Sequence, residues 1–164
     1  MTGFPLLVAL AATGAPASGL WLDVPFVRQA ENGCGPACVA MVARYWNAAR
    51  GGSTADAAAL APSGNPTPAR EMERSLGALG FRVFTFGGEW SDLEQHLARG
   101  RPLIVAVKAR ATGPLHYLVV CGVDSEQRLV LVNDPARRKL VTLERAAFEK
   151  GWRASGNWTL LALP

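Results

Sequence analysis

The chain has 164 residues, of which 49% are hydrophobic and 18% are charged, and its formal net charge at neutral pH is +4. This length and apolar content predict one compact globular domain with a substantial core, because two domains would each be too small. The basic residues are scattered, with one dense cluster over residues 137–139, so we expect a solvated basic surface and no nucleic-acid partner.

Residues 1–17 differ in composition from the rest of the chain. An apolar run over residues 4–12 is followed at 15–17 by Ala-Pro-Ala, small residues of the kind that precede a signal-peptidase cut. The run is too short to span a bilayer, and no lysine or arginine precedes it, so either the signal is incomplete or its true start lies upstream. We expect a signal peptide over residues 1–17, a domain over residues 18–164, export to the periplasm or cell exterior, and no stable membrane span. The alternative is an N-terminal segment that packs on the domain.

The next part of the chain shows helical periodicity. From Cys34 onward, apolar residues recur at three- and four-residue spacing, which predicts an amphipathic helix that ends before the Gly51-Gly52 pair. A short capped helix, a loop rich in Gly, Asn and Pro, and a further helix follow. We expect these four elements over residues 34–49, 53–62, 63–68 and 67–80.

After Gly80 the pattern changes to strands, which are runs of β-branched and aliphatic residues separated by turn residues. We expect strands over residues 81–86, 102–108, 115–123, 128–132, 139–141 and 158–163. Two helices interrupt them, one over residues 92–99 capped by Ser91 and Glu94, and one over about residues 143–150. This distribution predicts an α+β fold, in which an N-terminal helical part packs on a C-terminal antiparallel sheet.

Cys34 stands at the N-terminus of the first predicted helix. Free backbone N–H groups and the positive end of the helix dipole stabilise a thiolate there and lower the pKa of the thiol. The other two cysteines do not suggest a disulfide framework. Cys38 lies one helical turn after Cys34, where a bridge would be strained, and Cys121 lies within an apolar strand as a small core residue.

Nucleophilic acyl chemistry needs a thiol or hydroxyl, a base, a group that orients the base, and donors for the oxyanion. His116 begins one predicted strand, and Asp134 follows the next. If these strands pair antiparallel, the return of the chain brings Asp134 beside His116. Gln29 offers an amide group that can join the backbone N–H of Cys34 in an oxyanion hole. Cys34, His116, Asp134 and Gln29 are therefore the candidate catalytic residues.

Simpler interpretations exist for several of these residues. An isolated histidine such as His116 is usually structural, and His96, on a short helix, is expected to be a surface or half-buried residue. Asn133 competes with Asp134, because either side chain can accept a hydrogen bond from an imidazole, and strand alternation leaves the choice open.

A zinc site is a further alternative, with Cys34, Cys38, His116 and Cys121 as ligands. Structural zinc sites usually take closely spaced cysteine pairs on turns. His116 and Cys121 are five residues apart on one strand and are therefore expected to face opposite sides of the sheet. We expect no metal and no cofactor.

The order Gln29, Cys34-Gly35-Pro36, His116 and Asp134-Pro135, with Leu-Asp-Val-Pro-Phe at residues 22–26, resembles the bacteriocin-processing cysteine peptidases. These are papain-like domains at the head of ABC exporters or free-standing exported proteins, and the chain resembles the free-standing kind. The resemblance implies a papain-like fold and cleavage of peptide bonds, after a double-glycine leader in the exporter-linked members.

The same resemblance assigns roles to individual residues. It implies that Cys34 is the nucleophile, His116 the general base and then acid, Asp134 the orienting group and Gln29 the oxyanion donor. We therefore expect a cysteine endopeptidase that acts on a peptide or protein substrate, in a cleft walled by residues 63–68 and 109–115. The alternatives are an acyltransferase or amidase with the same triad, and a peptide-binding module without turnover.

Overall fold

The structure is a computed structural model, which describes residues 19–49 and 68–164. The predicted signal peptide over residues 1–17, the short helix over 53–62 and nearly all of the loop over 63–68 lie outside the described residues. Within the described ranges, no helix is both long enough and apolar enough to cross a membrane.

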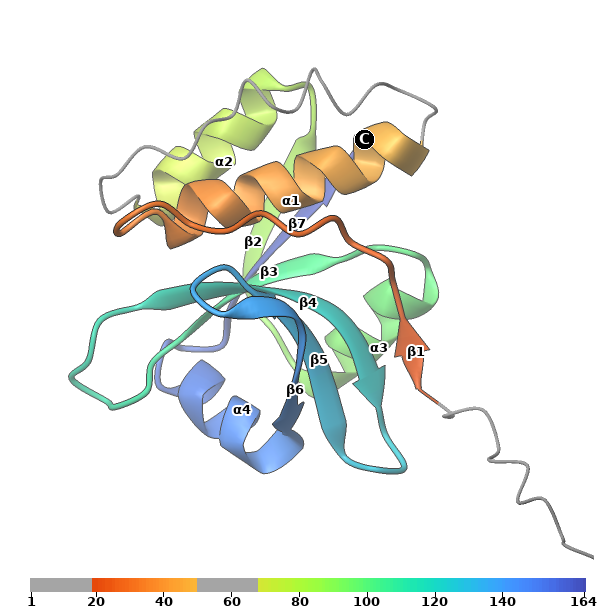
Figure 1. Cartoon of the computed structure of the whole chain (residues 1–164), viewed down its shortest axis with the longest axis vertical. Helices are drawn as coiled ribbons and strands as arrows, with labels where there is room; N and C mark the ends of the chain where they lie inside the picture. The colour runs from red at the N-terminus through yellow and green to blue at the C-terminus, as the bar shows by residue number, and fades with distance from the viewer. Residues whose placement is uncertain (1–18, 50–67) are drawn as a thin grey trace, which may run out of the picture.

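The described residues form four helices and seven strands (Figure 1). The helices are α1 (Cys34–Ala49), α2 (Ala69–Ala78), α3 (Trp90–Ala98) and α4 (Arg145–Arg153). The strands are β1 (Leu20–Trp21), β2 (Arg82–Gly87), β3 (Leu103–Val107), β4 (His116–Asp124), β5 (Leu129–Asp134), β6 (Arg138–Glu144) and β7 (Trp158–Leu163).

The strands form one antiparallel sheet in the order β2-β7-β3-β4-β5-β6, with β1 paired to β4 away from this path. β4 carries an irregularity between Val120 and Gly122, so that Cys121 has no direct partner on β5. A Cβ atom on Gly122 would lie 2.7 Å from the carbonyl oxygen of Leu20, so glycine is needed for β1 to approach. The predicted α+β class is therefore confirmed.

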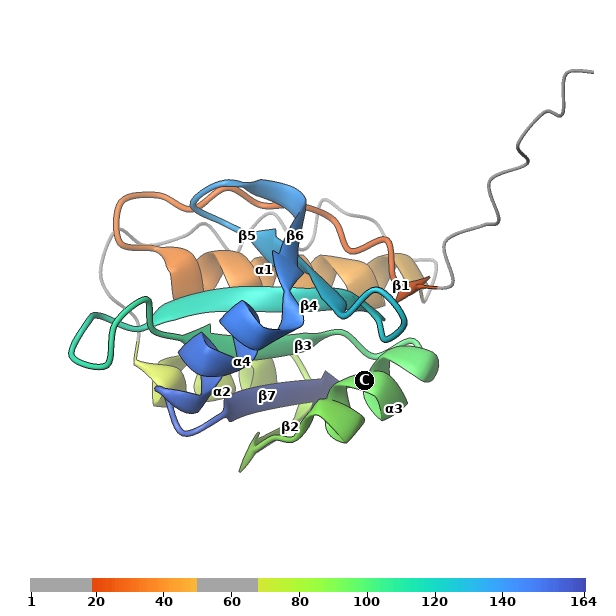
Figure 2. The same ribbon diagram turned by 90° about the horizontal axis from the view of Figure 1, so that it is seen from below.

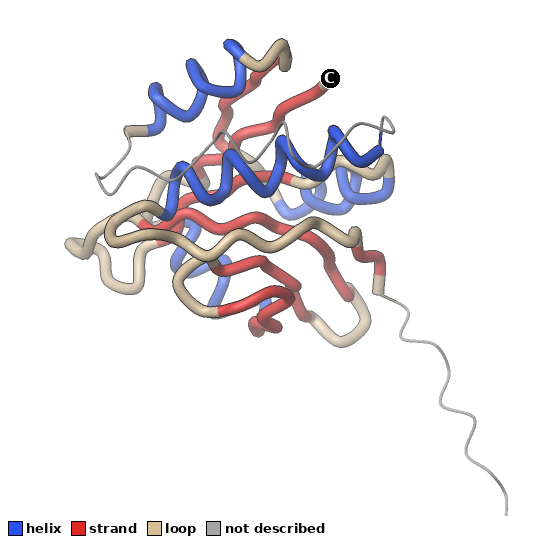
Figure 3. The backbone as a smooth tube through the Cα atoms, turned by 45° about the horizontal axis from the view of Figure 1, so that its top comes forward, coloured by secondary structure: helices blue, strands red, loops and turns tan. Residues whose placement is uncertain are grey.

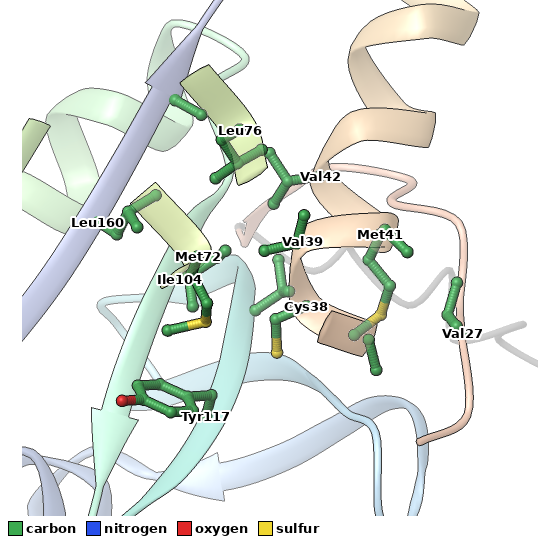
Figure 4. Close-up of a cluster of buried hydrophobic side chains, with 14 of the residues drawn as sticks. Val27, Cys38, Val39, Met41, Val42, Met72, Leu76, Ile104, Tyr117 and Leu160 are labelled. Atoms are coloured by element: carbon green, nitrogen blue, oxygen red, sulfur yellow. The ribbon is translucent and has the colours of Figure 1, made fainter. Parts of the chain in front are cut away.

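Helices cover both faces of this sheet (Figures 2 and 3). α1 and α2 pack on one face, where side chains such as Val42, Met72 and Ile104 form a buried cluster (Figure 4). α3 and α4 pack on the other face, where Leu93, Leu97 and Trp152 belong to a second cluster. The apolar side chains whose spacing predicts α1 are thus buried against the sheet. The sheet is covered on one face by α1 and α2 and on the other by α3 and α4.

α2 begins at Ala69 rather than at residue 67, because Pro68 has an extended backbone and forms the N-cap. Two further predicted helix starts are wrong. α3 begins at Trp90, earlier than the expected Asp92, because the backbone N–H of Glu89 donates to Asp92 Oδ2 at 2.7 Å in a capping box of Glu89 and Asp92. Ser91 lies inside the helix, and Glu94 instead accepts a hydrogen bond from Trp90 Nε1 at 2.7 Å.

The third correction concerns α4, which runs over Arg145–Arg153 rather than residues 143–150. Strand β6 is longer than expected, and its last residue, Glu144, still pairs with Leu129. The backbone N–H of Arg145 then donates to the carbonyl of Arg128 at 2.8 Å, so sheet pairing delays the start of the helix.

Replacing Trp152 with alanine is expected to lower the free energy of unfolding by about 3–5 kcal/mol. The Trp152 side chain is 2% exposed, packs on Phe148 with ring centroids 5.4 Å apart, and donates from Nε1 to the carbonyl of Trp158 at 3.2 Å. Urea unfolding measures the change. Phe84→Ala is the control, because Phe84 is 47% exposed on edge strand β2, and a similar loss in both variants would contradict the assigned core.

Candidate active site

A tight turn places Cys34 at the first residue of α1. The backbone N–H of Gly33 donates to the carbonyl of Ala30 at 2.9 Å, and Asn32 adopts a left-handed conformation with φ of 58°. The carbonyl of Gly33 accepts a hydrogen bond from the backbone N–H of Ala37 at 3.1 Å, and this is the first hydrogen bond of the helix. In this first turn the backbone N–H of Gly35 helps to lower the pKa of Cys34, as expected for a thiol at a helix N-terminus.

The β4–β5 hairpin brings His116 and Asp134 together. β4 and β5 pair antiparallel, so the start of β4 lies beside the end of β5. His116 Nε2 lies 2.8 Å from Asp134 Oδ1, which also accepts the backbone N–H of Ala136 at 3.0 Å. The Asp134 side chain is 12% exposed, which keeps water from competing for this contact. Asp134 therefore lies beside His116, as predicted from antiparallel pairing of the two strands.

Asn133 takes a different position from Asp134. It is fully buried, donates from Nδ2 to the carbonyl of Val24 at 3.0 Å, and accepts from the backbone N–H of Leu140 at 3.0 Å. Its amide therefore links β5 to the N-terminal segment and to β6. Of the two candidates, only Asp134 contacts the imidazole.

The Cys34 thiol and the imidazole of His116 line the same cleft, and each shifts the pKa of the other. Since Nε2 is held by Asp134, Nδ1 is the nitrogen that remains for the sulfur. Burial opposes the charged form of both groups, but their mutual hydrogen bond and charge outweigh it, so the pKa of Cys34 is lowered and that of His116 is raised. The backbone N–H groups of Tyr117 and Gly35 also contribute to the lowered pKa of Cys34. These shifts favour a thiolate–imidazolium pair.

The contribution of Tyr117 could not be foreseen from the sequence. It comes from a backbone N–H group, which every residue except proline carries, and only the position of β4 beside Cys34 gives it a role. A backbone donor of this kind has no residue signature.

Gln29 lies beside the triad. Its backbone N–H donates to the carbonyl of Pro135 at 3.0 Å, which ties it to the residue that follows Asp134. Its Oε1 is buried and has no hydrogen-bond partner in the described part of the chain. A buried polar atom without a partner is costly, and such a group calls for a functional explanation.

All four candidate residues are near one another, and three of them line one cleft. The cleft has a volume of about 640 Å³ and is open to solvent. Its lining residues are Gln29, Asn32, Cys34, Pro68, Pro114, Leu115, His116 and Tyr117. Pro68, Pro114 and Leu115 belong to the two loops expected to wall the site, and Asp134 lies behind His116.

The remaining cysteines and His96 lie away from the cleft. Cys38 and Cys121 are fully buried, and burial raises the pKa of Cys38 well above its usual value and that of Cys121 to about 12. Cys121 belongs to the cluster under α1, whereas His116 lines a pocket on the opposite face with Leu118, as alternation predicts. His96 is half-buried on α3. In the described ranges, no three His, Cys, Asp or Glu side chains are placed to hold a metal ion.

Solved structures of peptidases have this fold. A putative C39-like peptidase from Bacillus anthracis superposes with a TM-score of 0.68 at 18% identity, covering 89% of this chain and 98% of that one. The peptidase domain of Streptococcus ComA, a bifunctional ABC transporter involved in quorum sensing, gives 0.64 at 23% identity, covering 85% and 97%.

A third structure is a double glycine motif protease from an AMS/PCAT transporter, in complex with the leader peptide. Its TM-score is 0.62 at 18% identity, with 88% of this chain and 94% of that chain covered. These similarities confirm the predicted papain-like cysteine peptidase fold. No curated protein matches the sequence.

The sequence itself matches the Peptidase_C39 like family over residues 21–160, which include Gln29, Cys34, His116 and Asp134. The match spans most of the chain. The chain therefore belongs to the Peptidase_C39 like family and is a cysteine peptidase.

Proposed function

We propose that the protein hydrolyses peptide bonds through Cys34, His116 and Asp134, with Gln29 as an oxyanion donor. One observation carries the proposal: Cys34 and His116 line the same open cleft, and Asp134 Oδ1 holds Nε2 of the imidazole at 2.8 Å. A nucleophile, a base and an orienting group in this order are the requirements of covalent acyl chemistry.

The reaction begins with attack of the Cys34 thiolate on the carbonyl carbon of the substrate. The oxyanion that forms accepts hydrogen bonds from the backbone N–H of Cys34 and the amide of Gln29. The His116 imidazolium donates its proton to the amine as the C–N bond breaks, which leaves a thioester on Cys34. His116 then takes a proton from water, the water oxygen attacks the thioester, and the acid product departs as the thiolate reforms.

We propose that the substrate is a peptide or protein cut after small residues, such as a pair of glycines. The double glycine motif protease to which the chain is similar was solved with its leader peptide. Pro68, Pro114, Leu115 and Tyr117 wall the cleft beside Cys34 with bulky side chains, which favours residues without side chains before the cut. We further propose that the protein acts outside the cytoplasm, on the strength of residues 1–17.

A mild alkylating agent should react with Cys34 well below about pH 8, where an ordinary thiol is mostly protonated. Because the pKa of Cys34 is lowered, its thiolate forms at a lower pH than that of a free cysteine and persists as the pH rises. Intact mass and peptide mapping between about pH 4 and pH 9 measure the rate. Cys38 serves as an internal control, since it is buried and its pKa is raised.

The matched variant for this labelling experiment is His116→Ala, which removes the hydrogen bond and the charge that lower the pKa of Cys34. We expect the reactive pH range to move up toward that of an ordinary thiol. Equal labelling of Cys34 in both proteins would refute the thiolate–imidazolium pair and favour a peptide-binding module. Product analysis with an added amine distinguishes hydrolysis from acyl transfer, because an acyltransferase would form the amide.

A further inference from the structure

A second pocket lies on the other side of the His116 imidazole from Cys34. It has a volume of about 330 Å³, and Ala147, Phe148 and Gly151 of α4 form part of its lining. Its apolar lining comes from Val107, Leu118, Leu143, Ala147 and Phe148, and its cations are Lys108 and Arg137. Asp134 is the only carboxylate among the described residues that line it, and that carboxylate is already held by His116.

A third hollow continues this pocket away from His116. It has a volume of about 310 Å³ and shares Lys108 and Ala109 with the second pocket. Arg110, Lys150 and Arg153 also line it, and its lining contains no acidic residue from the described parts of the chain. We call this hollow, with Lys108, Arg110, Lys150 and Arg153, the basic basin.

The cations of the basic basin have no carboxylate partner among the described residues. Lys108 Nζ reaches only the carbonyl of Ala111, at 3.4 Å. The nearest acidic side chain on α4, Glu149, is held by Arg145 Nε at 3.0 Å. The basin therefore presents uncompensated positive charge beside an apolar pocket, a combination that favours an acidic ligand.

The chemistry of the site shows which part of a substrate this surface would meet. His116 gives its proton to the departing amine, so the amine must lie within hydrogen-bond reach of the imidazole. The amine belongs to the residue that follows the cut. The second pocket is lined by that same imidazole but not by Cys34, so it is the pocket next to the position of the departing amine.

We propose that the second pocket and the basic basin bind the part of the substrate that follows the cut, with an apolar residue first and acidic residues after it. This inference rests on the proposed function, and it names the substrate class of that site. The apolar side chain fills the pocket lined by Leu118 and Phe148, and the carboxylates that follow pair with Arg110 and Arg153. Exposed ion pairs each change binding by a factor of about two to five, so two pairs together give about 4- to 25-fold.

The test begins with a library of peptides incubated with the full chain and analysed by mass spectrometry for residues on both sides of each cut. A cleaved peptide is then made in three forms that carry aspartate, alanine or lysine at the second and third positions after the cut. We expect kcat/KM for the aspartate form to exceed that for the alanine form by about 4- to 25-fold. We expect the lysine form to be the poorest.

The variant Arg110→Glu/Arg153→Glu should reverse this order and favour the lysine form. The matched control Arg82→Glu/Arg99→Glu makes the same change in net charge at exposed positions on β2 and after α3, and it should keep the wild-type order. Equal rates for the three peptides, or an acidic preference confined to residues before the cut, would overturn the inference while leaving peptidase activity intact.

Failure of the proposed function gives a different result, in which no library peptide is cut. In that case the inference is tested by binding alone. Fluorescence anisotropy compares the affinity of the Cys34→Ala variant for the aspartate peptide and for the lysine peptide. Tighter binding of the aspartate form that is lost in Arg110→Glu/Arg153→Glu supports the basic basin as a ligand site. Equal binding of the two peptides rejects it.

Discussion

Replacing His116 with alanine is expected to lower kcat/KM for a cleaved peptide by about 10⁴-fold or more. The variant loses the group that favours the Cys34 thiolate and the acid that protonates the departing amine. It also leaves Asp134 without its partner at 2.8 Å. Initial rates over a range of substrate concentrations measure the loss, and circular dichroism confirms that the fold is retained.

Two further variants distinguish this loss from general damage to the protein. Cys34→Ala should be as inactive as His116→Ala, and the double variant should be no worse, because residues that act as a unit give non-additive losses. His96→Ala removes the other histidine of the chain, on α3, and should keep full activity. Retention of more than about one per cent of activity by His116→Ala would be incompatible with its role as general base and acid.

The helix start and the hairpin explain why much of the site can be predicted from the sequence. A cysteine before an apolar periodic run predicts a nucleophile at a helix N-terminus, and two adjacent strands predict the return of Asp134 to His116. Both features depend on local periodicity, which the sequence carries directly. Local periodicity does not decide between Asn133 and Asp134. The regular alternation of side chains between the two faces of the sheet is interrupted by irregularities in the β4–β5 and β5–β6 pairing.

Other parts of the site depend on tertiary packing and therefore leave no signal in the sequence. The backbone N–H of Tyr117 reaches Cys34 only because β4 passes under the start of α1. The second pocket exists because α4 packs on β3, where the backbone N–H of Lys108 donates to the carbonyl of Gly151 at 3.0 Å. A Cβ atom on Gly151 would lie 3.1 Å from the carbonyl oxygen of Lys108, so this glycine allows the close approach.

Alanine at position 29 is expected to lower kcat by about 10²- to 10³-fold, the usual cost of removing one oxyanion-hole donor. KM should change little, because the oxyanion exists only in the transition state and not in the bound substrate. The backbone of Gln29 is held by the hydrogen bond from its N–H to the carbonyl of Pro135, which any residue except proline at position 29 can keep. The change should therefore remove the side-chain donor without moving the chain.

Labelling of Cys34 separates an oxyanion donor from a residue that only shapes the site. Gln29 is not among the groups that shift the pKa of Cys34, so Gln29→Ala should label with the wild-type pH profile while turnover falls. Gln29→Glu is the stricter variant, since a carboxylate of similar size would repel the oxyanion and should be at least as slow as Gln29→Ala. If either variant instead raised KM with kcat unchanged, Gln29 would bind the substrate in its ground state, and the backbone N–H of Cys34 would have to stabilise the oxyanion without it.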